Sequence, residues 1–131
     1  MVGILVVSHG KLAEALISSV QFLVGSLKKV KGISIWPRDR KEEVRDRIKK
    51  GINELDEGDG VVVLTDILGG TPTNLILSVL EDKNVEVVTG VNMPMLLTLS
   101  SHRKEGSLRK LGRLAKKSGR RSIVLARKVS V

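Results

Sequence analysis

The chain has 131 residues, of which 41% are hydrophobic and 28% are charged. This balance suits one globular domain spanning 1–131 and excludes a disordered chain, while the lack of cysteine excludes disulfides, thiolate metal sites and cysteine nucleophiles. The net charge is +9, yet residues 1–100 carry 12 Lys and Arg against 13 Asp and Glu, and residues 101–131 carry 11 against 1. The basicity therefore belongs to the C-terminal segment, which argues against a uniformly basic nucleic-acid binder.

The hydrophobic segments are too short for a membrane protein. No run approaches 18 consecutive apolar residues, so no membrane span is predicted. The opening apolar run, residues 2–7, lacks the preceding basic region of a signal peptide and is too short to be one. We therefore expect a cytoplasmic protein.

The first half of the chain predicts two strands that alternate with two helices. Residues 2–7 are apolar and largely β-branched, as in a strand buried on both faces, and residues 32–36 predict a second strand. Between them, apolar residues recur at helical spacing: Leu12, Leu16, Val20, Leu23 and Leu27. Asp39 is the expected N-cap of a second helix, whose apolar stripe is Val44, Ile48, Ile52 and Leu55.

The second half continues the alternation. Residues 61–65 predict a third buried strand, followed by a helix from Pro72 to about Glu81 and a fourth strand over 85–89. A short helix is expected after Pro94, and a basic helix is expected from a break near Gly106 to about Lys117. Residues 122–126 predict a last short strand.

Strands that alternate with helices predict a three-layer α/β/α fold around a mostly parallel sheet, and right-handed crossovers leave few topologies for it. Among these we expect the strand order 2-1-3-4, in which the order reverses between the first and third strands. Ligands of such sheets bind outside the carboxyl ends of the strands, where the strand order reverses. His9 follows the first strand and Asp66 follows the third. Because these two strands are neighbours in this order, we expect His9 and Asp66 to lie side by side.

A carboxylate beside an imidazole fixes the tautomer and leaves the other ring nitrogen pointing outward. Such an imidazole can act as a base, a metal ligand or a nucleophile. The loop after Asp66 favours an anion, because Gly69 and Gly70 allow backbone amides to approach a ligand and Thr71 is a plausible helix N-cap. Together these residues predict a phosphoryl group held on or near His9.

Other sites lack essential parts. The sequence has no G-x-G-x-x-G after the first strand and no G-x-x-x-x-G-K-[ST], which disfavours dinucleotide and P-loop sites. A metal would need more ligands, and the other histidine, His102, is interpreted as a solvated loop residue. These residue patterns therefore disfavour a metal site, a dinucleotide site and a P-loop.

The chain resembles the IIA component of the mannose/fructose/sorbose family of the bacterial phosphoenolpyruvate-dependent sugar phosphotransferase system. Three blocks carry the resemblance in the same order along the chain: residues 3–10 (GILVVSHG), 66–74 (DILGGTPTN) and 89–96 (TGVNMPML). The resemblance covers essentially the whole chain.

The resemblance implies that His9 accepts a phosphoryl group from the carrier protein HPr and passes it to a IIB component. It implies that Asp66 orients the imidazole, that Thr71 helps to hold the phosphoryl group, and that no cofactor or metal is needed. It further implies a homodimer in which a C-terminal antiparallel strand, here residues 122–126, is exchanged between subunits. Contact with the membrane components IIC and IID would be indirect and would bring the protein to the membrane periphery through the sugar-transport complex.

Three features leave alternatives open. The apolar stripe of the basic helix is flanked by Arg109, Lys110, Arg113, Lys116 and Lys117. These cations form either a solvated face or a surface for an acidic partner, nucleic acid or anionic membrane, and the second reading allows a regulatory protein controlled by His9 phosphorylation. An apolar loop near the same sheet edge as His9, with Met93, Met95, Leu96 and Leu97, is interpreted as core packing, with partner docking as its alternative. Trp36 is also interpreted as packing, with recognition of a partner as its alternative.

Overall fold

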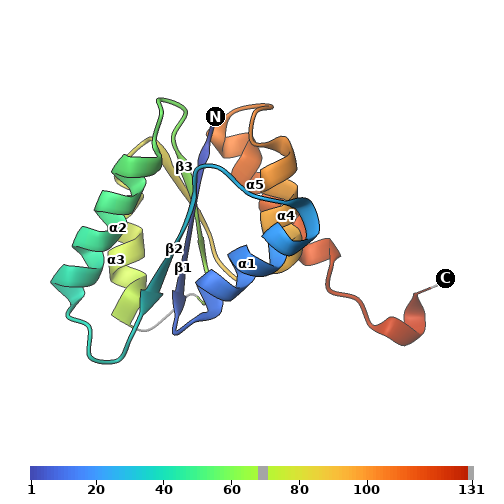
Figure 1. Ribbon diagram of the computed structural model, residues 1–131, viewed down its shortest axis with the longest axis horizontal. Coiled ribbons are helices and arrows are strands. Elements are labelled where there is room, and N and C mark those ends of the chain that lie inside the picture. Colours follow the sequence, from blue (N-terminus) through green and yellow to red (C-terminus); the bar gives the residue numbers. More distant parts are fainter. Residues whose placement is uncertain (68–70, 130–131) are drawn as a thin grey trace.

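A parallel sheet forms the centre of the molecule, as Figure 1 shows. The computed structural model describes residues 1–67 and 71–129. Within them the sheet consists of β1 (Gly3–His9), β2 (Val30–Ile35), β3 (Val61–Thr65) and β4 (Val85–Val88). Every pairing is parallel and the order is β2-β1-β3-β4, which confirms the predicted topology.

Helices cover both faces of this sheet (Figure 1). On one face lie α1 (Leu12–Val24), α4 (Met93–His102) and α5 (Leu108–Arg121), and on the other lie α2 (Lys41–Leu55) and α3 (Thr71–Val79). Successive strand residues point to opposite faces of the sheet, and each face has its own hydrophobic core cluster. Val6 belongs to the first cluster, under α1, α4 and α5, and Leu5 belongs to the second, under α2 and α3. The three-layer prediction is therefore confirmed.

The buried face of α1 differs from the predicted stripe. Of the predicted stripe, Val20 is fully buried and Leu27 packs against the first core cluster, but Leu12 and Leu23 are 45% and 60% exposed. Ala13, which the stripe did not include, is fully buried. The cause lies in β2, where a β-carbon at Gly32 would lie only 3.2 Å from Cδ1 of Ile17 and 3.5 Å from Cβ of Ala13. Because Gly32 has no side chain, the face of α1 that carries Ala13 and Ile17 can pack directly against β2.

Asp39 does not cap α2, so that prediction is wrong. The N-cap residue is Arg40, which makes no side-chain cap hydrogen bond. The Asp39 carboxylate instead accepts a hydrogen bond from the Trp36 amide (2.8 Å) and pairs with Arg47 (3.0 Å). It therefore closes the turn between β2 and α2.

The C-terminal segment departs from the prediction twice. Helix α5 continues past Lys117 to Arg121. Gly119 in this added stretch packs closely on α4, since a β-carbon there would lie 2.6 Å from Cγ of Met95. Residues 122–126 do not form the predicted strand in the single chain. They lead into a short 3₁₀ turn, η1 (Ala126–Lys128), on a tail that projects away from the domain in Figure 1 and therefore has no strand of its own chain to pair with.

The apolar segment after Gly90 is part of the core. Met95 and Leu96 are 2% and 0% exposed, and Met93 and Leu97 pack against the same cluster. The packing interpretation is confirmed, although these residues lie in α4. His102 is exposed as predicted, but it is the last residue of α4 and not a loop residue.

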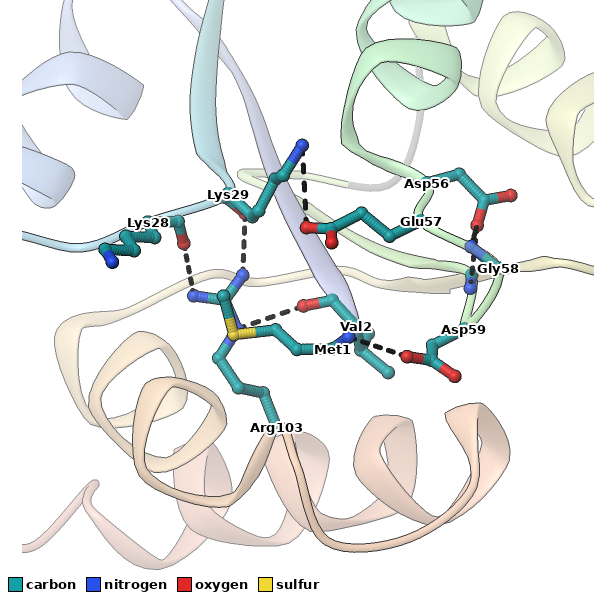
Figure 2. Close-up of polar contacts among 10 residues, drawn as sticks. Met1, Val2, Lys28, Lys29, Asp56, Glu57, Gly58, Asp59 and Arg103 are labelled. Carbon is teal, nitrogen blue, oxygen red and sulfur yellow. Dashed lines mark hydrogen bonds and ion pairs between the residues drawn. The ribbon is translucent and has the colours of Figure 1, made fainter.

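A buried arginine ties α4 to the amino-terminal edge of the sheet (Figure 2). Arg103 is 5% exposed, and its guanidinium donates to the carbonyl oxygens of Val2 (3.0 Å), Lys28 (2.5 Å) and Lys29 (2.7 Å). Lys29 has a φ of +53°, a strained value for a residue with a side chain, and its carbonyl also accepts from the amide of Ile4 (3.0 Å). Arg103 thus fixes the starts of β1 and β2 relative to the α4–α5 layer.

Candidate functional site: a histidine–aspartate pair

The ends of β1 and β3 bring His9 and Asp66 together. Val7 and Thr65 are register partners in the parallel pairing, so the residues that follow them emerge at the same edge of the sheet. Oδ2 of Asp66 lies 2.9 Å from the backbone nitrogen of His9 and 2.9 Å from Nδ1 of its ring. The predicted adjacency is therefore present, and one carboxylate oxygen contacts both the backbone and the ring of the same histidine.

The Asp66 carboxylate is held in its charged form. Burial raises the pKa of Asp66, but the amide of His9, the ring of His9 and the amide of Ile67 all hydrogen-bond to the carboxylate and together outweigh burial. The Ile67 amide donates to Oδ1 over 2.8 Å. The pKa of Asp66 therefore lies below its ordinary value, and the group is an anion at neutral pH.

An ionised carboxylate can only accept a hydrogen bond, so Nδ1 of the His9 ring must carry the proton that it shares with Asp66. The neutral imidazole then has its lone pair on Nε2. The His9 side chain is 49% exposed, whereas that of Asp66 is 15% exposed. The pair thus consists of a half-exposed imidazole with a defined tautomer and a mostly buried Asp66 carboxylate that contacts its Nδ1.

The turn after His9 is fixed by features that the sequence analysis did not single out. The buried Ser8 hydroxyl accepts a hydrogen bond from the amide of Ala13 (2.7 Å), which ties the end of β1 to the first turn of α1. Gly10 adopts a φ of +58°, and its amide donates to the carbonyl of Ile35 (2.9 Å). A serine one residue before a strand-end histidine is the sequence signal that could have indicated this brace.

The structure describes only part of the predicted phosphoryl-binding loop. Gly69 and Gly70 lie outside the described residues. Thr71 is the first residue of α3, one position later in the helix than the predicted N-cap. The start of α3 therefore lies five residues after Asp66, on the segment that leaves the carboxyl end of β3.

Trp36 is not simply a packing residue. It is 40% exposed, and a β-carbon at Gly10 would lie 3.9 Å from Cζ3 of its ring. Its backbone follows Ile35, the register partner of His9. The indole therefore lies beside the turn that carries the candidate site.

The basic helix forms a separate surface. Its five predicted cations are all exposed, and within the described part of the chain none of them makes an ion pair: Arg109, Lys110, Arg113, Lys116 and Lys117. A groove of about 760 Å³ runs between β4 and α5 and does not include His9. Across residues 1–67 and 71–129, no three side chains of the metal-binding kinds cluster.

Comparisons with known proteins identify the family of the chain. A family model described as "PTS system fructose IIA component" (EIIA-man) matches residues 3–115. The chain is 32% identical over 124 residues to the "PTS system mannose-specific EIIAB component" of Escherichia coli K12, covering 93% of this chain and 38% of that protein. It is 27% identical over 112 residues to the "PTS system fructose-specific EIIA component" of Bacillus subtilis, covering 85% of this chain and 77% of that protein.

A solved structure shows the same fold. The phosphotransferase system component EIIA from Streptococcus agalactiae superposes with a TM-score of 0.88 at 26% identity, covering 98% of this chain and all of that one. The chain spans only 38% of the length of the mannose-specific EIIAB relatives that it matches. The match over residues 3–115 contains both His9 and Asp66. The chain therefore belongs to the EIIA-man family of phosphotransferase system IIA components.

Proposed function

We propose that this protein is a phosphocarrier of the sugar phosphotransferase system and that His9 is the residue that carries the phosphoryl group. The observation that supports the proposal is the 2.9 Å contact between Nδ1 of His9 and the charged Asp66 carboxylate, which places the lone pair of the neutral ring on Nε2. Family membership supports the same role, with HPr as donor and a IIB component as acceptor. Mannose-type and fructose-type relatives both match, so the sugar is left open.

The chemistry needs no proton transfer on this chain. The Nε2 lone pair of His9 attacks the phosphorus of phosphohistidine on HPr, the new N–P bond forms, and the donor's N–P bond breaks with its electron pair returning to the donor ring. The proton stays on Nδ1, where Asp66 stabilises the positive charge that the ring gains. Passing the group to IIB reverses these steps. Phosphoryl transfer depends mainly on such positioning and charge stabilisation. The amides at the start of α3, with Gly69, Gly70 and Thr71, would hold the phosphoryl oxygens.

The direct test uses phosphoenolpyruvate, enzyme I and HPr. The wild-type protein is expected to gain one acid-labile phosphate by intact mass, because the Nε2 lone pair is available. His9→Gln is expected to gain none, and His102→Gln, which removes the other histidine, is the matched control and should gain one. No phosphate on the wild type while HPr itself is phosphorylated would contradict the proposal.

A homodimer by strand exchange is part of the proposal. Strand β4 is at the edge of the sheet, and the groove of about 760 Å³ beside it is lined in part by Ile123. The tail exposes three consecutive apolar side chains: Ile123 (79%), Val124 (62%) and Leu125 (68%). Leaving such a run in water is unfavourable, and exposed apolar patches often mark an interaction site. An edge strand accepts another strand through its free amides and carbonyls, so the tail of one subunit would pair antiparallel with β4 of the other.

Light scattering tests this arrangement. The wild type is expected to have twice the 14.3 kDa mass of the chain, and a Val124→Lys/Leu125→Lys variant is expected to be monomeric. Leu77→Lys on α3, which is 50% exposed, is the control and should stay dimeric. A monomeric wild type at micromolar concentration would contradict exchange.

A regulatory role is the second candidate, favoured by the exposed cations of α5. Arg113, Lys116, Lys117, Arg120 and Arg121 line a groove of about 530 Å³. Such a surface attracts an acidic partner, with nucleic acid and anionic membrane as weaker alternatives. This role predicts partner binding that changes with His9 phosphorylation and weakens with salt.

For the location, no helix in the described part of the chain has the length and apolar character needed to cross a bilayer. We propose that the protein acts in the cytoplasm. Its contact with the membrane would be peripheral, through IIB and the IIC and IID components.

A further inference from the structure

Exposed apolar side chains gather next to the candidate site. Leu12 is 45% exposed and lies in the first turn of α1, three residues after His9. Ile67 is 58% exposed and directly follows Asp66, to which its amide donates. Trp36 is 40% exposed beside Gly10. Three segments far apart in the sequence therefore each place a large apolar residue in water at the edge where His9 is exposed.

Trp36 is held on a braced turn. Its amide donates to Oδ2 of Asp39 (2.8 Å), and its carbonyl accepts from the Asp39 amide (3.0 Å). Arg47 bonds to the same Asp39 oxygen (3.0 Å) and to the carbonyl of Ser34 (3.0 Å), so α2 supports the turn. Trp36 belongs to neither of the two core clusters. The bracing therefore fixes the place of a residue that the core does not use, which lowers the entropy lost when something binds it.

We infer that Trp36 is the anchor of the docking surface for HPr, with Leu12 and Ile67 forming the rest of its apolar contact. This inference rests on the proposed function. A protein donor must bring its own phosphohistidine to within bonding distance of Nε2, so its surface has to cover the residues beside His9. Tryptophan is enriched among residues that dominate binding energy at the centres of interfaces, where water is excluded. Trp36 thereby sets the affinity for the donor without touching the transferred group.

The test separates docking from chemistry. Phosphorylation rates are measured over a range of phospho-HPr concentrations for the wild type and for Trp36→Ala. The half-saturating HPr concentration is expected to rise by about tenfold or more, while the maximal rate stays within about twofold, because an interface anchor costs affinity and not reactivity. Trp36→Phe is expected to recover part of the affinity.

Phe22→Ala is the matched control. Phe22 is the chain's only phenylalanine, is 89% exposed and lies near the end of α1, so its loss should change neither parameter. An unchanged half-saturating concentration for Trp36→Ala, or a fall in maximal rate alone, would overturn the inference and leave the phosphocarrier role standing. No phosphate on the wild type would instead contradict the proposed function itself.

Trp36 also gives a direct readout of docking, since it is the only tryptophan. Titration with unphosphorylated HPr that lacks tryptophan is expected to change the emission of the wild type with a saturable dependence on concentration. Covering the indole removes it from water, which is the physical origin of the change. Emission that stays constant at HPr concentrations that saturate phosphorylation would contradict docking at Trp36.

Discussion

Replacing Asp66 with asparagine is expected to slow phosphorylation of His9 by about 100-fold or more, the scale seen when a residue that orients a reacting imidazole is changed. The Asp66 carboxylate forces the proton onto Nδ1 and leaves Nε2 free. The asparagine amide can instead donate to Nδ1, which places the proton on Nε2 and removes the attacking lone pair. It also removes the anion that stabilises the positive ring. Initial rates at saturating phospho-HPr measure the effect.

Asp46→Asn is the matched control, because Asp46 is an exposed carboxylate on α2 and the same change there should leave the rate unaltered. Thermal unfolding of both variants separates loss of chemistry from loss of fold. A folded Asp66→Asn protein whose rate stays within threefold of the wild type would show that the pair does not position the ring for transfer.

Replacing Arg103 with alanine is expected to lower the free energy of unfolding by about 3 kcal/mol or more. Each hydrogen bond from a charged group contributes about 1.5–3 kcal/mol, and removing the donor leaves buried carbonyls without their partner. Three carbonyls lose that donor, although Lys29 keeps the amide of Ile4. Burial lowers the pKa of Arg103 and the Glu57 carboxylate partly offsets this, but an arginine keeps its charge at neutral pH. Urea unfolding at neutral pH measures the loss.

Lys104→Ala is the neighbouring control, since Lys104 is exposed and should change stability by less than about 0.5 kcal/mol. Arg103→Lys keeps the charge but cannot reach three carbonyls in the same fixed geometry, so it should fall between the two. A loss below about 1 kcal/mol for Arg103→Ala would mean that the hydrogen bonds of Arg103 in Figure 2 do not hold the starts of β1 and β2 against the α4–α5 layer.

The sheet and the pairing of His9 with Asp66 were predictable from sequence patterns. Buried β-branched runs define β1 and β3, and the alternation with helices predicts that they are parallel. A strand order that reverses between them makes them neighbours, so residues at their carboxyl ends lie at the same edge. His9 and Asp66 could be paired on this ground alone, before any side-chain contact was known. Their 2.9 Å contact follows from the register of Val7 with Thr65.

Features that depend on distant contacts were not predictable. Arg103 is one of eleven Lys and Arg residues in the segment 101–131, and nothing in the local sequence distinguishes it from the exposed ones. One of its hydrogen-bond acceptors, the carbonyl of Val2, lies 101 residues away in the sequence. Gly32 on the next strand shapes the buried face of α1, so helical spacing correctly marked Val20 but also marked Leu12 and Leu23, which are exposed. Asp39 fits an N-cap in sequence, but Trp36 and Arg47 compete for its carboxylate.

The nitrogen that carries the phosphate tests the account most directly. The uniformly ¹⁵N-labelled protein, phosphorylated through HPr, is examined by long-range ¹H–¹⁵N correlation of its histidine rings. The contact between Nδ1 and Asp66 predicts phosphate on Nε2 of His9, with Nδ1 still protonated and His102 unmodified. Phosphate on Nδ1 of His9, or on any other residue, would contradict the role assigned to the pair.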